Sequence, residues 1–168
     1  AGAPRPDGEA DRDQEVVVAR PAPTEARLTN PCMGFIYYGG TENPDIADVY
    51  YATAVWGDLE PREGEFDWDH PSLKGMIEEA RKRGKRVAIR VLTSFQGKPW
   101  ATPKWVHDLG VGRFPVEFPN SDMTGFEGMY EPEWWNPAYI EKYCNFIAAF
   151  GKKFDGQPWL DYVDMRCY

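Results

Sequence analysis

The stretch that decides the fold is PSLKGMIEEARKRGKRVAIRVLT, residues 71–93. In its first half, apolar residues recur at the i, i+3, i+4, i+7 spacing of one buried helix face, namely Leu73, Met76, Ile77 and Ala80. Pro71 suits the first turn of this helix and Gly84 suits its end. The second half, RVAIRVLT (86–93), is rich in β-branched residues, which is typical of a parallel strand covered by helices.

Similar patterns lie on both sides of this helix-strand unit. Apolar or aromatic runs at 33–38, 49–56 and 160–168 predict three more strands. Asn136-Pro137 predicts the start of a second helix, whose buried face we expect to contain Ile140, Tyr143, Cys144 and Ile147. Residues 94–133 read as a long irregular loop, and a loop of that length is usually functional.

The alternation of strands and helices predicts an α/β fold with a parallel sheet. One unit of a (β/α)8 TIM barrel takes about 30 residues or slightly more, so the organised part of this chain covers about the first four βα units. We therefore expect two regions. Residues 1–25 form a flexible leader, rich in Pro, Gly and acidic residues, and residues 26–168 form the N-terminal half of a (β/α)8 catalytic barrel.

Composition excludes some classes of function. The chain has 168 residues, a formal charge of −8 and a pI near 4.8, and an acidic chain is poorly suited to nucleic-acid phosphates. No apolar run approaches the roughly 20 residues of a membrane span, so we expect no membrane insertion. Aromatic residues make up 15% of the chain. Trp and Tyr rings stack on sugars but also fill protein cores, so composition leaves both roles open.

The cysteines and histidines form no metal-binding pattern. Cys32, Cys144 and Cys167 are far apart, which allows either one disulfide with a remaining thiol or three reduced thiols. His70 lies at a helix start, where a structural role is expected, and His107 has no ligand spacing. We expect no metal and no cofactor.

Alternation within the strands predicts which side chains face the barrel interior. In the run 86–93, Val87, Ile89 and Val91 should pack on helices, which leaves Arg90 pointing inward. In the last strand the same alternation predicts an apolar set that packs on helices, Val163, Met165 and Cys167. The residues between them should then face the barrel interior, namely Tyr162, Asp164, Arg166 and Tyr168. A buried charge is costly unless paired, so Asp164 should pair with Arg90 or Arg166. A structural ion pair and a site near the strand C-termini both fit this pattern.

Aromatic residues near the strand ends add to these charges. Tyr38 and Trp56 close the first two strands, and Trp100 follows the third on its long loop, all where a sugar could stack. Trp68 sits at a helix entry beside Phe66 and is expected to pack. The candidate substrate-binding residues are Tyr38, Trp56, Arg90, Trp100 and Arg166.

Several motifs resemble a group of bacterial glycoside-hydrolase-like (β/α)8 barrels, β-galactosidase-like and often described only as domains of unknown function. The strongest is WGDLEPREGEFDW (56–68), which is similar to the segment after the second strand in many retaining glycosidases. Weaker matches are NPCMGF (30–35), the segments PW (99–100) and PKW (103–105), which resemble a P-x-W loop after the third strand, and DGQP (155–158) before VDMR (163–166). The residues of the 56–68 motif also have a structural reading as tight turns and helix-entry packing.

The resemblance implies a glycoside hydrolase that cleaves O-glycosidic bonds of an oligosaccharide or polysaccharide with paired carboxylates. In such families the acid/base Glu follows the fourth strand and the nucleophile lies near the seventh, and no residue here matches either position. Asp58, Glu60 and Asp164 are nearby acids but stand elsewhere, so no catalytic residue is assigned in this chain. The expected partner is the C-terminal half of the barrel, and the expected location is secreted or periplasmic.

Two rival functions remain open from the sequence. One is a non-catalytic carbohydrate-binding or assembly module that keeps the barrel scaffold. The other is a polysaccharide lyase, in which Tyr and Arg would replace the carboxylate pair. Arg90 and Arg166 also leave open an acidic sugar as the substrate.

Overall fold

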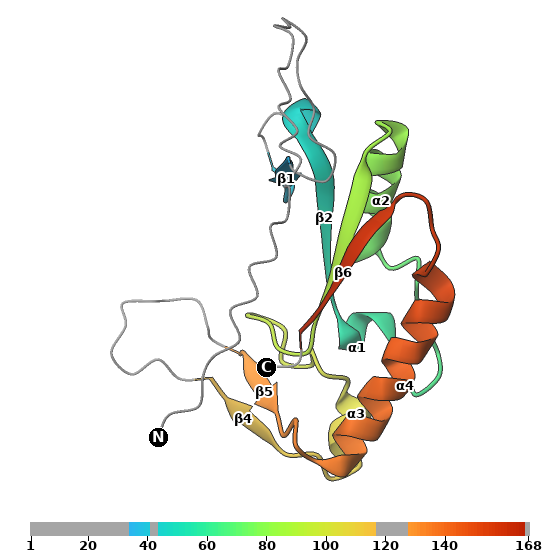
Figure 1. Cartoon of the computed structure of the whole chain (residues 1–168). Helices are drawn as coiled ribbons and strands as arrows, with labels where there is room; N and C mark the ends of the chain where they lie inside the picture. Colours follow the sequence, from blue (N-terminus) through green and yellow to red (C-terminus); the bar gives the residue numbers. More distant parts are fainter. Residues whose placement is uncertain (1–33, 41–43, 117–127, 167–168) are drawn as a thin grey trace, which may run out of the picture.

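A four-stranded parallel sheet forms the centre of the computed structural model, which describes residues 34–40, 44–116 and 128–166. Its strands lie in the order β1-β2-β3-β6, with all neighbours parallel (Figure 1). The bounds are β1 (Phe35–Tyr37), β2 (Ala47–Val55), β3 (Arg86–Leu92) and β6 (Leu160–Arg166). The predicted α/β fold with a parallel sheet is therefore confirmed, and each predicted strand is present.

Helices connect these strands, and a hairpin lies apart from the sheet. The helical segments are η1 (Pro44–Ile46), α1 (Trp56–Leu59), α2 (Pro71–Lys82), α3 (Lys104–Asp108) and α4 (Pro137–Phe154). The hairpin pairs β4 (Arg113–Pro115) with β5 (Tyr130–Pro132) in antiparallel fashion. The predicted irregular stretch 94–133 thus contains a short helix and two short strands. Their three to five residues are too few to give a readable period in the sequence.

The two long helices begin where the sequence predicts, and a side chain caps each of them. The ring nitrogen Nδ1 of His70 accepts a hydrogen bond from the backbone N–H of Ser72 (3.3 Å) at the start of α2. The side-chain oxygen of Asn136 accepts from the N–H of Ala138 (3.0 Å) at the start of α4. Each cap satisfies a donor that the first helical turn leaves without a partner, and a proline follows each cap.

The core lies between one face of the sheet and helices α2 and α4. Val87, Ile89 and Val91 of β3 are fully buried there, as predicted. The buried face of α4 consists of aromatic residues, which are Tyr139, Tyr143, Phe146, Phe150 and Phe154. Of the four residues predicted for that face, Tyr143 alone is buried. The large rings bury more apolar area than the smaller side chains beside them, so the helix turns its rings inward.

A second apolar stripe on α4 is left at the surface. Ile140 is 48% exposed, Ile147 is 38% exposed and Cys144 is an exposed free thiol. These three residues, here called the outer flank of α4, share one side of the helix because they recur at i, i+4, i+7.

Leader residues 1–25, Cys32, Cys167 and Tyr168 lie outside the described residues, so the predictions made for them stay predictions.

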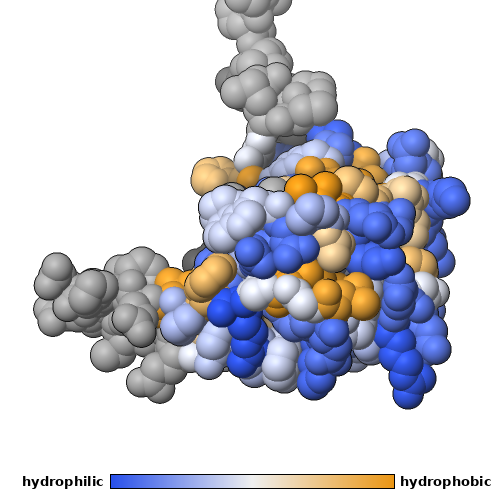
Figure 2. All heavy atoms as spheres, turned by 90° about the horizontal axis from the view of Figure 1, so that it is seen from below, coloured by the Kyte–Doolittle hydropathy of each residue, from blue (hydrophilic) through white to orange (hydrophobic). Residues whose placement is uncertain are grey.

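More apolar side chains reach the surface at the end where the strands finish. Figure 2, which looks at the molecule from below, shows hydrophobic patches between charged side chains at this end. Exposed apolar residues at the end of α3, in the hairpin and in the segment before α4 include Leu109, Phe114, Trp134 and Trp135. None of the helices in the described part of the chain is long and apolar enough to cross a membrane.

Candidate functional site

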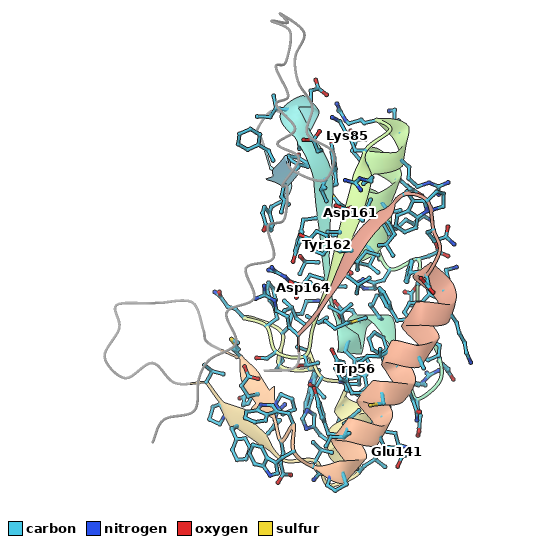
Figure 3. All side chains as sticks on the ribbon, in the orientation of Figure 1. Trp56, Lys85, Glu141, Asp161, Tyr162 and Asp164 are labelled. Atoms are coloured by element: carbon cyan, nitrogen blue, oxygen red, sulfur yellow. The ribbon has the colours of Figure 1, made fainter. Side chains whose placement is uncertain are left out.

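The face of the sheet opposite the core, here called the open face, carries polar and aromatic side chains in register. Tyr51 of β2, Ala88 of β3 and Tyr162 of β6 lie at one level across three strands. Arg90 and Asp164 are paired one level further toward the strand ends. Figure 3 shows Tyr162 and Asp164 following one another along β6. The strand alternation that buries Ile89 on the core side therefore presents Arg90 on this side, as predicted.

Asp164 is the centre of a hydrogen-bonded cluster on the open face. Its Oδ2 accepts from the hydroxyl of Tyr51 (2.6 Å) and from Nε of Arg90 (2.9 Å). Nε of Arg166 donates to both carboxylate oxygens, at 3.1 Å to Oδ1 and 3.0 Å to Oδ2. The predicted pairing of Asp164 with an arginine is confirmed, and the structure shows that one carboxylate serves both arginines.

The protonation states of the cluster follow from these contacts. Burial raises the pKa of Asp164, but the hydrogen bonds from Tyr51, Arg90 and Arg166 outweigh it, so the net pKa lies below its usual range. Burial, together with donation to the carboxylate of Asp164, raises the pKa of Tyr51 to about 12. Near neutral pH the cluster therefore holds an ionised carboxylate, a neutral phenol and two guanidinium cations.

Aromatic rings surround this ionic centre. The ring of Tyr38 lies 4.8 Å from that of Tyr51, and the ring of Tyr162 lies 6.2 Å from it on the other side. The guanidinium carbon of Arg90 lies 4.5 Å from the centre of the Tyr51 ring, which fixes its plane by a cation–π contact. Tyr38 is 62% exposed, so its ring offers a surface for a ligand.

The structure brings together three of the five predicted substrate-binding residues: Tyr38, Arg90 and Arg166. Trp100 belongs to a second group near the hairpin, where the guanidinium of Arg113 lies 4.1 Å from the Trp100 ring and 4.0 Å from the Tyr130 ring. Trp100 remains 42% exposed there. Within the described residues, no hydrogen bond or ring contact joins this second group to Asp164.

Trp56 lies elsewhere, and its prediction needs correction. Its side chain is fully buried in the core, with rings of Trp105, Tyr139, Tyr143 and Phe146 within 5.1–6.0 Å. The strand ends one residue before Trp56, and the α1 turn directs the indole into the core. A ring without exposed surface cannot stack on a sugar in this structure.

The buried indole explains part of the 56–68 motif. The N–H of Trp56 donates to Oε2 of Glu60 (2.7 Å), and Oε1 of Glu60 accepts from the backbone N–H of Gly64 (2.8 Å). These two hydrogen bonds lower the pKa of Glu60, but burial has the larger effect, so the net pKa is raised above its usual value. Phe66 and Trp68 stack in parallel at 4.8 Å at the entry to α2, as predicted for helix-entry packing. The motif therefore holds a loop together in the described structure.

The remaining nearby acid is also engaged, since Asp58 accepts a hydrogen bond from Nζ of Lys98 (2.8 Å).

Tyr51 is the residue of the open face that sequence reasoning missed. Its signal was present, because alternation in β2 places residue 51 on the face opposite Ala52 and Tyr50, which are in the main core. The Arg113–Tyr130 contact had no signal, because β4 and β5 were not predicted.

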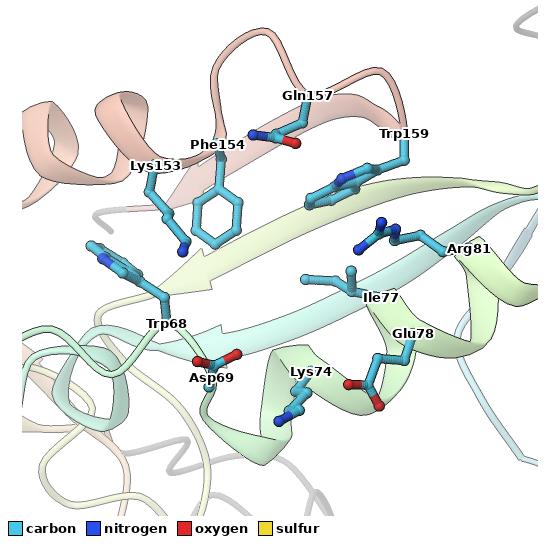
Figure 4. Close-up of a pocket in the computed structure, with 10 residues that line it drawn as sticks. All are labelled: Trp68, Asp69, Lys74, Ile77, Glu78, Arg81, Lys153, Phe154, Gln157 and Trp159. Carbon is cyan, nitrogen blue, oxygen red and sulfur yellow. The ribbon is translucent and has the colours of Figure 1, made fainter.

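One hollow of about 250 Å³ lies on the helix side of the molecule, between α2 and the turn that follows α4 (Figure 4). Its apolar floor includes Trp68, Ile77, Phe154 and Trp159, and Lys74, Arg81 and Lys153 are among its charged residues. Residue Ile77 is part of the core side of the sheet, so this hollow is separate from the open face.

No protein-family profile matches the chain, and no curated protein does. Among solved structures, a GH1 β-glucosidase from Exiguobacterium antarcticum B7 is similar with a TM-score of 0.44 and 17% identity, over 73% of this chain. A β-glucosidase from Exiguobacterium marinum is similar with a TM-score of 0.43 and 16% identity, over 71% of this chain. The chain spans 22% and 20% of the lengths of these two structures.

Proposed function

We propose that this chain forms the first half of a (β/α)8 barrel of the glycoside-hydrolase kind and lends carbohydrate-binding residues to its cleft. The observation that carries the proposal is the open face, which joins an exposed Tyr38 ring to the fixed Arg90–Asp164–Arg166 cluster. Aromatic faces pack on the apolar side of sugar rings, while charged planar groups bond their hydroxyls.

The order of the strands supports the barrel part of the proposal. The four strands follow one another in the sheet in chain order, and all are parallel. Both long helices pack on the same face of β3. In a (β/α)8 barrel the other face becomes the interior, and the active site lies at the strand C-termini. Asp164 and Arg90 lie within two residues of those ends.

The outer flank of α4 supports a further half-barrel as the partner. Lys142, on the other side of α4, bonds Glu63 of the loop before α2 (2.9 Å) and so marks the side that faces the earlier units. Ile140, Cys144 and Ile147 lie on the side of α4 away from Lys142 and are exposed, and Val163 of β6 is 38% exposed. We propose that the next βα units cover these apolar residues.

Hydrolysis would require carboxylates from that partner half. A retaining glycosidase needs two carboxyl groups about 5–5.5 Å apart. Asp164 is held by three donors, and Glu60 is buried with both oxygens bonded. These bonds suit positioning rather than nucleophilic attack, so we propose that the catalytic pair lies outside this chain.

The rival functions make different demands on the same cluster. A non-catalytic binding module would use the open face in the same way, and only activity of the assembled protein separates it from a hydrolase. A lyase would need a base in the cleft. The pKa of Tyr51, raised to about 12, keeps its phenol protonated near neutral pH, so this tyrosine is unsuited to that task.

Isothermal titration of the 168-residue chain with neutral and acidic oligosaccharides tests the binding part of the proposal. We expect Tyr38→Ala to weaken sugar binding at least fivefold. Phe35→Ala is the matched control, since Phe35 is also an exposed aromatic residue and lies on β1, the strand that Tyr38 directly follows. A chain that binds none of the sugars, or binds them equally well in both variants, would contradict the proposal.

A further inference from the structure

The hollow on the helix side of the molecule combines an aromatic floor with charged rims (Figure 4). Phe154, which is almost fully buried, lies between two indoles and meets each of them at nearly a right angle. The centre of its ring is 5.7 Å from that of Trp68 and 6.1 Å from that of Trp159. These ring contacts continue into the main core, so the floor of the hollow is held by the fold itself.

The two indoles differ in how much of their ring surface is already covered. Phe66 stacks in parallel on Trp68 at 4.8 Å. Trp159 is partly exposed, and within the described part of the chain its one ring contact is the edge contact with Phe154. Trp159 therefore leaves room for a flat ligand ring, which aromatic side chains attract beyond the effect of burial alone.

Three cations line the hollow without a fixed partner. Within the described residues, Lys74, Arg81 and Lys153 take part in no side-chain hydrogen bond and no ion pair. By contrast, Arg83 just after α2 bonds two carboxylates, and so does Lys142 of α4. The same two helices thus fix some of their cations and leave others free to meet a ligand at the aromatic floor.

The lining of the hollow also sets the charge that a ligand should carry. Asp69 and Glu78 are the acidic residues that line it, against three cationic ones, and neither has an ion pair among the described residues. The lining therefore has one positive charge in excess, in a chain whose formal charge is −8. One excess charge matches an ionised carboxylate, whereas a phosphate monoester carries about 1.5–2 negative charges near neutral pH.

The size of the hollow limits the ligand further. A dry cavity of about 150 Å³ holds one benzene molecule, and pockets for drug-sized ligands begin at about 300 Å³. The hollow, at about 250 Å³, lies between these sizes. It therefore suits a molecule with one or two rings.

We propose that this hollow binds a small aromatic carboxylate, with the ligand ring against Trp159 and Phe154 and the carboxylate on Arg81. Figure 4 shows Arg81 extending toward the side of the hollow where Trp159 lies, and Lys153 on the other side of Phe154. A guanidinium presents two parallel N–H donors to a carboxylate, so Arg81 is the anchor. Lys74 and Lys153 add attraction from the rims.

This inference goes beyond the proposed function, because the hollow is on the helix side of the sheet and the proposed sugar site is on the open face. Three probes separate the contribution of the ring from that of the charge. 2-Naphthoate has both, 2-naphthalenemethanol has the ring alone, and acetate has the carboxylate alone.

Each probe is titrated into the ¹⁵N-labelled 168-residue chain, and the indole N–H signals are followed by NMR. We expect 2-naphthoate to bind at least tenfold more tightly than either of the other probes, since it alone uses both the rings and the cation. It should shift the signals of Trp68 and Trp159, which line the hollow, and leave the signal of the buried Trp56 in place.

Variants identify the residues that bind the probe. Arg81→Gln should reduce the affinity for 2-naphthoate at least tenfold and leave that for the alcohol within about twofold, and Lys153→Gln should cost about threefold. Trp159→Leu should weaken both ring-bearing probes. The matched controls are Lys82→Gln and Lys152→Gln, which remove one charge from the adjacent exposed position of the same helix, outside the hollow. Because all four charged positions are exposed, these variants should fold, as circular dichroism can check.

Several results would overturn the inference. One is 2-naphthoate that does not bind, or that binds no more tightly than the alcohol. Another is an affinity that the two controls lower as much as Arg81→Gln does, because the attraction would then come from the charge of the whole chain. Shifts confined to other indole signals would place the ligand elsewhere and overturn the site. Sugar binding at the open face is measured separately, so none of these results decides the proposed function.

Discussion

The two faces of strand β3 differ completely although their residues alternate one by one. On the helix side, Val87, Ile89 and Val91 have no exposed surface and pack against α2 and α4. On the open face, Arg90 remains partly exposed and bonds a carboxylate from the neighbouring strand. The core side consists of apolar contacts whose burial stabilises the fold. The open face contains polar contacts that are directional, so it is the side on which a ligand can be recognised.

The largest expected loss of stability is at Phe146 of α4, and its neighbour Ile147 on the outer flank gives the contrast. Phe146 is fully buried beside Trp56 and Trp68, so Phe146→Ala should lower the free energy of unfolding by about 3–5 kcal/mol. Ile147→Ala, on the outer flank, should cost less than about 1 kcal/mol because that side chain is 38% exposed. Urea denaturation followed by circular dichroism measures both. Equal losses would mean that the outer flank is covered in solution.

A smaller loss is expected at the hydrogen bond that ties Trp56 to Glu60. Trp56→Phe keeps a buried ring but removes the N–H donor, which leaves Oε2 of Glu60 without that partner. We expect a loss of about 1–3 kcal/mol in unfolding free energy, the usual cost of such a buried polar group. Trp100→Phe serves as the control on an exposed indole and should change stability little. Retained sugar binding in Trp56→Phe would agree with the buried position of this ring.

On the open face, Asp164→Asn should produce a pH-dependent loss. The substitution removes the charge that both arginines share, and we expect about 1–3 kcal/mol at pH 7 from weakened charged hydrogen bonds. The pKa of Asp164 is lowered in the folded state. Its contribution is therefore present above the unfolded value of about 3.9 and disappears as the pH falls through the lower folded value.

Denaturant curves between pH 7 and pH 2.5 check that sign. The gap in unfolding free energy between the unmodified chain and Asp164→Asn should be constant above about pH 5 and narrow below about pH 4. A gap that widens in acid would contradict the lowered pKa. Asp161→Asn, which removes the carboxylate that pairs with Arg86 on the same two strands, is the matched control for removing a carboxylate from β6.

The smallest effect on stability is expected at Tyr38. Its ring is 62% exposed, so Tyr38→Ala should change the unfolding free energy by less than about 1 kcal/mol. The same variant should lose sugar affinity, which would place recognition and stability on opposite faces of the sheet. A Tyr38→Ala chain that unfolds much more readily would show that this ring belongs to the fold, and it would remove the variant as a probe of binding.

How much could be predicted from the sequence differs between these faces. The strand and helix positions were predictable because burial enforces strict periodicity, as in 71–93. The same alternation placed Arg90 and Asp164 on one face. The buried side of α4 was predicted wrongly, because the helix carries two apolar stripes and periodicity alone cannot rank them. The position of Trp56 depended on a four-residue helix, α1, that leaves no period in the sequence.

The two edges of the sheet are unlike in the described residues, and this limits the ways in which copies of the chain could pair edge to edge. Within the described residues, the sheet ends in β1 on one side and in β6 on the other. Pairing of β6 from one copy with β1 of the next would be heterologous, and such contacts generate closed rings or open filaments. In polymer terms, each copy would then be a monomer with two different ends. The distribution of molecular mass, measured as the protein concentration is raised, would then distinguish the two forms. A closed ring has one fixed mass, whereas a filament keeps growing.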